Sequence, residues 1–185
     1  SHPFEDASGR ELSNYPDALF GLFLDLKKPN NIISHFLVEF QNTRHQGKAT
    51  SLNGAIDNYF NNSIYQSGWT YFGRTIGSPF LPPKETVGGL TQGIKISHSR
   101  ASSLNIGLKG FINASFSYKT NFSYTKYPGW FNSPIDEKQF SSLFELYYTK
   151  ENLPFQVSLG AALDSGNFLP NNFGGFIRIV KSGKF

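Results

Sequence analysis

The stretch that decides the fold is Phe155-Gln156-Val157-Ser158-Leu159-Gly160-Ala161-Ala162-Leu163-Asp164. Its apolar residues Phe155, Val157, Leu159, Ala161 and Leu163 recur at every second position, whereas Gln156, Ser158 and Asp164 fall between them. Successive side chains of a β-strand point to opposite faces, so a period of two over ten residues predicts a strand with one apolar and one wet face.

The same period recurs along the chain, and it predicts seven strands in all. They cover residues 18–27, 32–41, 93–110, 114–126, 139–150, 155–164 and 174–181. No segment has a convincing 3.6-residue period, which an amphipathic helix would require. The sequence therefore predicts an all-β fold.

Composition narrows the class of protein. The 185 residues contain no Cys, so disulfides and thiolate chemistry are excluded. The longest nearly uninterrupted apolar run, Ala18–Leu24, is much shorter than the roughly 20 residues of a transmembrane helix. The net charge is +4, but the basic residues are scattered and the longest basic run is Lys27-Lys28. A nucleic-acid binder usually carries a basic stripe, so we expect no nucleic-acid partner.

Two all-β architectures fit the alternation. In residues 114–126 the aromatics Phe116, Tyr118, Phe122 and Tyr124 face away from Ser117, Lys119, Asn121 and Ser123. An apolar outer face and a polar inner face are typical of an antiparallel transmembrane β-barrel. A soluble β-sandwich with one exposed face gives a similar pattern and remains an alternative.

The lengths of the connections favour the barrel. Short joins are expected at 28–31, 111–113 and 151–154, and longer ones at 42–92, 127–138 and 165–173. Outer-membrane barrels alternate tight periplasmic turns with longer outer loops in this way. Because such barrels normally have an even number of strands, seven strands predict that the chain, as one segment of residues 1–185, is part of a larger barrel, with a long outer loop or plug at about 42–92.

The expected long loop at 42–92 contains the most distinctive sequence motifs of the chain. It contains Asp57-Asn58-Tyr59, Tyr65, Gly68-Trp69, Tyr71, Gly73-Arg74, Ile76-Gly77 and Pro79. This run resembles the Wzi-type capsule-assembly proteins of the Gram-negative outer membrane, in their Bacteroidetes-type branch. Similarity to that family extends to Glu5-Asp6-Ala7-Ser8-Gly9, Leu108-Lys109-Gly110 and Asp164-Ser165-Gly166. It also includes Asp17-Ala18-Leu19-Phe20-Gly21, in which Ala18 stands where the family usually has Gly.

The resemblance implies an 18-stranded barrel, of which about eleven strands would lie outside this chain. It also implies a non-catalytic surface lectin that holds capsular or extracellular polysaccharide. The loop residues supply suitable chemistry, because aromatic rings stack on the C–H faces of sugars and planar polar groups bind their hydroxyls. The candidate glycan-binding residues are Arg44, Asp57, Asn58, Tyr59, Tyr65, Gln66, Trp69, Tyr71 and Arg74.

Each candidate also has a structural interpretation. Trp69 and Tyr71 share a face if the chain is extended, and they could form an interfacial aromatic belt or pack a plug against the barrel wall. Asp57 and Asn58 could cap a turn through their own backbone, which is the favoured interpretation for them. Arg74 could pair with a carboxylate inside the barrel.

We expect no enzyme, cofactor or metal. The His residues form no metal-binding pattern on one face, and the sequence has no G-x-S-x-G nucleophile motif. An outer-membrane porin, or a subunit of a larger outer-membrane complex, is the alternative function. The expected partners are polysaccharide, outer-membrane lipid and other outer-membrane proteins or the missing part of the barrel.

Overall fold

The computed structural model describes residues 12, 14–27, 31–47, 57–62, 64–65, 67–72, 74–82, 96, 98–131, 133–150 and 153–181. These residues contain strands and no helix, which confirms the all-β prediction. No described helix has the length and apolar character needed to cross a membrane. The strands are β1 (Ala18–Asp25), β2 (His35–Asn42), β3 (Thr70–Tyr71), β4 (Arg74–Thr75), β5 (Ser102–Phe111), β6 (Phe116–Trp130), β7 (Ser133–Tyr148), β8 (Phe155–Gly166) and β9 (Asn172–Lys181).

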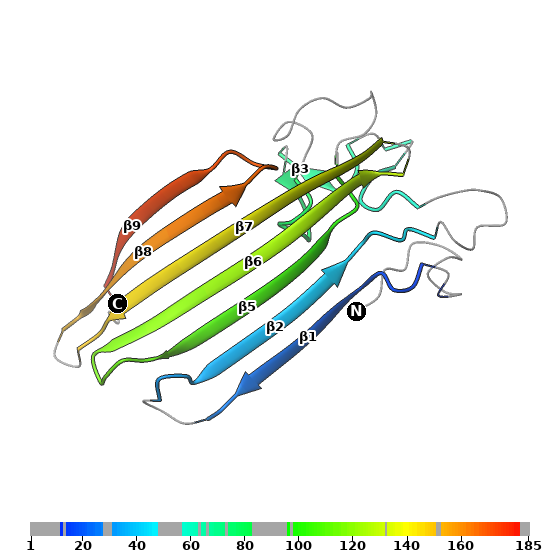
Figure 1. Cartoon of the computed structure of the whole chain (residues 1–185). Helices are drawn as coiled ribbons and strands as arrows, with labels where there is room; N and C mark the ends of the chain where they lie inside the picture. Colours follow the sequence, from blue (N-terminus) through cyan, green and yellow to red (C-terminus); the bar gives the residue numbers. More distant parts are fainter. Residues whose placement is uncertain are drawn as a thin grey trace. The chain divides into compact units, whose positions relative to one another are not determined.

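Seven of these strands form one sheet in the order β1-β2-β5-β6-β7-β8-β9 (Figure 1). Hydrogen-bonded neighbours thus follow one another along the chain, as in an antiparallel meander. Among the described residues β1 and β9 are the two edges, and the sheet is open. The seven predicted strands correspond to the seven strands of this sheet, and the short strands β3 and β4 were not predicted. Closure into a barrel remains a prediction.

Two details of the prediction are wrong. Residues 93–95 and 97 of the expected strand 93–110 lie outside the described residues, and its described part becomes a continuous strand only at Ser102. Ile96 forms only an isolated β-bridge, and its backbone is also held by the side chain of Asn61. Asn61 Oδ1 accepts from the Ile96 amide at 3.0 Å, and Asn61 Nδ2 donates to the Ile96 carbonyl at 2.9 Å.

The expected long loop at 127–138 is also absent. β6 continues to Trp130 and β7 begins at Ser133, so only two residues separate them. Gly129 permits this because its backbone has φ +70°, and a Cβ there would clash with the Ser133 carbonyl oxygen. Connection lengths therefore do not alternate strictly between short and long, which removes part of the argument for a barrel.

The chain divides into two compact units, and many of the strands run through both. We name them the loop unit (Ser1–Phe20, Phe40–Ser103, Thr125–Lys138) and the strand unit (Gly21–Glu39, Leu104–Tyr124, Gln139–Phe185).

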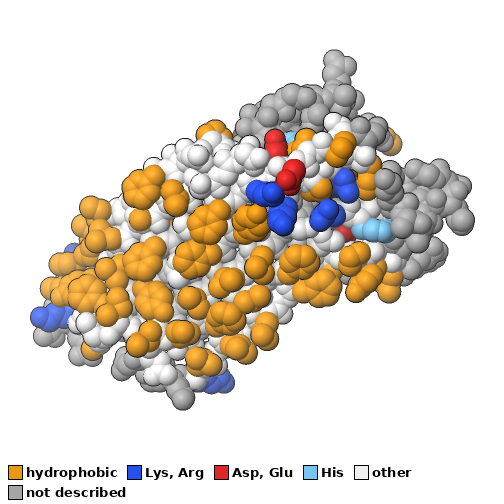
Figure 2. Space-filling model, in the orientation of Figure 1, with side chains coloured by type: hydrophobic (Ala, Val, Ile, Leu, Met, Phe, Trp, Pro, Cys, Tyr) orange, Lys and Arg blue, Asp and Glu red, His pale blue; other side chains and the backbone are white. Residues whose placement is uncertain are grey.

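One face of the strand unit is apolar and exposed. The register pairs Leu163 with Phe173 and Leu159 with Ile177, and cross-strand partners share a face. Each of these four side chains is exposed. Figure 2 shows many apolar side chains on the surface of the sheet strands. Soluble monomers rarely leave so continuous an apolar surface uncovered.

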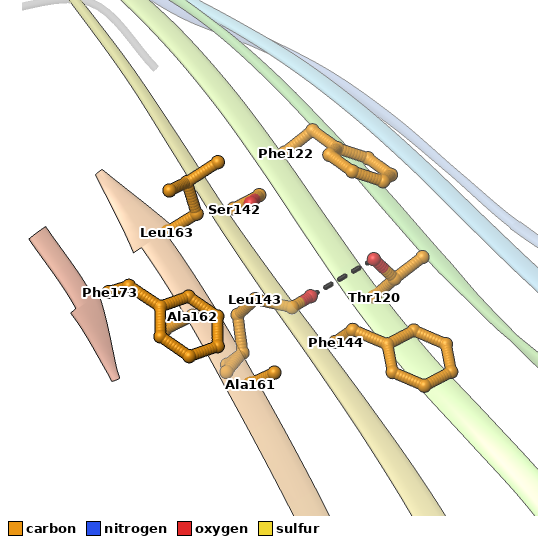
Figure 3. A pocket seen from close by; sticks show the side chains of 9 residues that line it. All are labelled: Thr120, Phe122, Ser142, Leu143, Phe144, Ala161, Ala162, Leu163 and Phe173. Carbon is orange, nitrogen blue, oxygen red and sulfur yellow. Dashed lines mark hydrogen bonds between the residues drawn. The ribbon is translucent and has the colours of Figure 1, made fainter. Parts of the chain in front are cut away.

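A shallow groove of about 240 Å³ crosses this apolar face (Figure 3). It lies where the small side chain of Ala161 stands opposite Phe144, with Phe122, Leu163 and Phe173 around it. The only polar side-chain groups that line it are two hydroxyls, those of Ser142 and Thr120, and the Thr120 hydroxyl donates to the Leu143 carbonyl at 3.0 Å. The face is therefore apolar even where it is hollowed.

The opposite face of the strand unit is polar. Ser158 and Glu145 are buried there, and Ser141 donates a hydrogen bond to Asp164, its cross-strand partner. Over all described residues, buried polar residues outnumber buried apolar ones. This distribution is the reverse of that in a water-soluble domain, whose core is apolar.

Candidate functional site

The loop unit is organised around Asp17, whose side chain is fully buried. Its carboxylate accepts hydrogen bonds from the backbone amides of His45 (2.9 Å) and Gln46 (2.7 Å), and from Asn42 Nδ2 at 2.9 Å. Ser102 Oγ in turn donates to Asn42 Oδ1 at 2.7 Å. Asp17, the residue just before β1, thus holds the chain segment that follows β2.

Two of the predicted glycan-binding residues belong to this buried polar structure. Asn14 Nδ2 donates to the Tyr59 hydroxyl at 2.9 Å, and Tyr59 is buried. Burial, reinforced by the negative charge of Asp17, raises the pKa of the Tyr59 hydroxyl well above its usual value. Asn58 Oδ1 accepts from Asn61 Nδ2 at 2.9 Å and from Ser99 Oγ at 3.0 Å. Both side chains hold the loop together.

Asp57 lies beside them and is half-buried. Its backbone amide donates to the Gln46 carbonyl at 3.0 Å, so this residue also joins the loop to the end of β2. Gln66 and the side chain of Arg74 lie outside the described residues.

The predicted aromatics of the segment 64–76 are exposed instead. Tyr65, Trp69 and Tyr71 have 74%, 63% and 67% of their surface accessible. β3 and β4 form a hairpin in which Thr70 pairs with Thr75 and Tyr71 with Arg74. The Ile76 amide donates to the Trp69 carbonyl at 2.9 Å and extends this pairing.

Phe72 is a residue that the sequence analysis missed. It is the most exposed aromatic of the hairpin, and its ring meets that of Tyr71 edge to face, with centroids 4.5 Å apart. Its position in the turn, with φ +46°, directs a large apolar ring into solvent. The alternation of a strand gives no signal for such a residue, since it belongs to a turn. We call Tyr65, Trp69, Tyr71 and Phe72 the hairpin aromatics.

The hairpin is attached to a defined base. The Trp69 amide donates to the Phe60 carbonyl at 2.8 Å, and Gly68, with φ +56°, approaches the same carbonyl so closely that a Cβ would clash with it. Farther along, the Tyr127 hydroxyl donates to the Phe80 carbonyl at 2.9 Å. The aromatics are therefore presented from a segment that hydrogen bonds hold at both ends.

Arg44 lies apart from the hairpin, in a groove of about 660 Å³ within the loop unit. The groove is lined by Pro16, Phe40, Asn42, Arg44, His45, Arg100, Ser102 and Phe131. The sequence analysis did not identify Arg100 as a site residue, because the alternation placed it inside a long strand.

The arrangement offers flat apolar surfaces and hydrogen-bonding groups. Among the residues that the structure describes, no group of three or more His, Asp or Glu side chains could hold a metal ion. The structure exposes three of the predicted aromatics, buries Tyr59 and places Arg44 in a groove that no hairpin residue lines. Comparison with protein-family models, with curated proteins and with solved structures gives no significant match to this chain.

Proposed function

We propose that this chain is part of an outer-membrane β-barrel that binds capsular or other extracellular polysaccharide at the cell surface without catalysis. The observation that carries the proposal is the exposure of all four hairpin aromatics on a segment that hydrogen bonds hold at both ends. Sugar-binding sites need rigid aromatic planes in solvent, because a stacked ring loses little conformational freedom when the ligand binds.

The membrane part of the proposal is supported by the sheet. Lipid would cover the exposed apolar face of the strand unit, and the buried polar residues of the other face suit the interior of a barrel. Additional strands pairing with β1 and β9 would supply the backbone hydrogen bonds that these edges lack within the described chain.

A binding experiment tests the lectin function directly. The protein, purified in detergent and also displayed on cells, is titrated with extracted capsular polysaccharide and screened on a glycan array. Tyr71→Ala and Trp69→Ala are each expected to weaken binding about ten-fold, as the loss of a stacking anchor does at other interfaces.

The matched control is Tyr15→Ala, because Tyr15 is similarly exposed (64%) in the loop unit but is not part of the hairpin. Tyr15→Ala should bind like wild type. If wild type, Tyr71→Ala and Trp69→Ala bind polysaccharide with equal affinity, the proposed site is wrong. Purified protein that stays monodisperse without detergent would refute the barrel.

A further inference from the structure

The groove around Arg44 carries two positive charges, and the buried carboxylate of Asp17 offsets them only in part. Two arginines, Arg44 and Arg100, line it, together with His45. No carboxylate is among the lining residues, and no described carboxylate lies within ion-pair distance of either guanidinium. The nearby Asp17 is fully buried and accepts three hydrogen bonds of its own, two from backbone amides and one from Asn42.

Arg100 is held in a fixed orientation. Its guanidinium lies 3.7 Å from the centroid of the Phe131 ring, Nε donates to the Arg44 carbonyl at 2.8 Å, and Nη1 donates to the Gly129 carbonyl at 2.6 Å. Both acceptors are neutral carbonyls, so these bonds orient the guanidinium without neutralising it. A guanidinium has five N–H donors, so N–H groups remain that can bind an anion.

The two arginines also repel each other. Burial and the positive charge of Arg44 lower the pKa of Arg100, and the negative charge of Asp17 opposes this shift in smaller part. The side chain stays protonated at neutral pH because arginine loses its proton only in strong base. An anion in the groove would relieve this repulsion. Oxyanions such as phosphate match the planar fork of arginine donors well.

The remaining wall of the groove identifies the kind of anion. Phe40 and Asn42 are two residues apart on β2 and so point to one face, and Ser102 of β5 bonds to Asn42 across the strands. Phe40 is 41% exposed, and Phe131 and Pro16 line the same groove. The groove therefore joins a doubly cationic part to apolar rings on one face of the sheet. A free inorganic ion would leave these rings unused.

We propose that Arg44 and Arg100 bind the phosphate of an anionic membrane lipid, whose apolar portion contacts Phe40 and Phe131. This inference rests on the membrane part of the proposed function, because the lipid reaches the groove only if this face meets a bilayer. It assigns Arg44 to lipid instead of polysaccharide. A basic residue near a membrane surface typically strengthens binding to anionic lipid several-fold.

Lipid retention measures this binding. Protein in detergent micelles is mixed with phosphatidylglycerol or with phosphatidylcholine, and bound lipid is counted by native mass spectrometry. Arg44→Gln is expected to reduce retention of phosphatidylglycerol about five-fold without changing that of phosphatidylcholine. Arg44→Lys should restore much of it, since the charge returns.

Arg178→Gln is the matched control. Arg178 lies 5.0 Å from the Phe176 ring centroid, and its register partner Ser158 is buried on the polar face of the strand unit. This variant should retain lipid like wild type. Arg100→Lys provides a second test, because it keeps a charge in the groove but loses the planar fork, and weaker phosphatidylglycerol retention is expected.

Three results would overturn the inference. The first is unchanged phosphatidylglycerol retention in folded Arg44→Gln, and the second is an equal loss of both lipids. The third is displacement of the lipid by millimolar inorganic phosphate or by acidic polysaccharide, which would assign the site to a soluble anion. Polysaccharide binding is measured on the same variants. Loss of lipid selectivity with wild-type glycan affinity supports the assignment, whereas a failed lipid test with intact Tyr71-dependent glycan binding refutes only this inference.

Discussion

Gly160 and Phe176 lie directly opposite each other across the β8–β9 ladder, and the Phe176 ring occupies the space where a Cβ on residue 160 would stand. The ring covers the backbone of its cross-strand neighbour and shields the hydrogen bonds of an edge strand. Only glycine leaves room for this contact.

Gly160→Ala should therefore destabilise the β8–β9 pair by about 1–3 kcal/mol, the usual cost of overpacking a close contact. Thermal unfolding in detergent measures the change. Gly174→Ala is the control, because nothing lies within 4 Å of the Cβ it would add, and it should be close to neutral. In the double variant with Phe176→Ala the penalty at residue 160 should largely vanish, and additive effects would contradict the contact.

Asp17→Ala is expected to lower the free energy of unfolding by about 2–4 kcal/mol. The substitution leaves the His45 and Gln46 amides without their acceptor, and each unpaired buried group costs about 1–3 kcal/mol. Asp17→Asn keeps one acceptor oxygen and should cost less. The exposed pair of Asp136 with Lys138 at 2.9 Å provides a control, since Asp136→Ala should change stability by no more than about 0.5 kcal/mol. Equal losses in the two alanine variants would contradict the central role of Asp17.

Stability should depend on pH through His98. Burial lowers the pKa of His98 below 6.5, so the unfolded chain takes up a proton before the folded one does as pH falls. The free energy of unfolding should therefore decrease as pH drops below about 6.5 and level off below the folded pKa. His98→Gln should flatten this part of the curve relative to wild type in thermal melts between pH 5 and 8. A slope that is unchanged in the variant would show that the imidazole is not the group responsible.

Arginine substitutions distinguish the two faces of β8. Leu159 lies on the exposed apolar face, and Leu159→Arg should cost about 2–4 kcal/mol if lipid covers that face, as at the midplane of outer-membrane barrels. Gln156→Arg places the same charge on the polar face and should be tolerated. Refolding into phospholipid vesicles, monitored by denaturant titration, compares the two. Similar stabilities would argue that the apolar face does not meet lipid.

The sequence predicted the strands well where the alternation itself is the cause of the fold. β8 was expected at residues 155–164 and is observed at Phe155–Gly166, because an apolar row every second residue fits only an extended chain with two different environments. The join between β6 and β7 was not predicted. Pro128-Gly129 has the composition of a turn, and nothing local reveals that Gly129 continues the strand at positive φ.

The site was predicted only in part, for a similar reason. Tyr59 and Trp69 have the same kind of side chain for stacking on a sugar, yet Tyr59 is buried and Trp69 is exposed. The difference comes from Asn14, which donates to the Tyr59 hydroxyl from 45 residues away. Contacts of such long range leave no periodic signal in the sequence.

The order of the strands in the sheet determines where the chain can tolerate insertions. Every sheet strand pairs with its neighbour along the chain, and the segment between β2 and β5 is inserted between two strands that pair with each other. Lengthening or exchanging that segment leaves the ladder intact, and the entropic cost of a longer loop grows only with the logarithm of its length. A change of length or sequence in this segment, which carries the exposed hairpin aromatics, is therefore expected to leave the pairing of β2 with β5 in place.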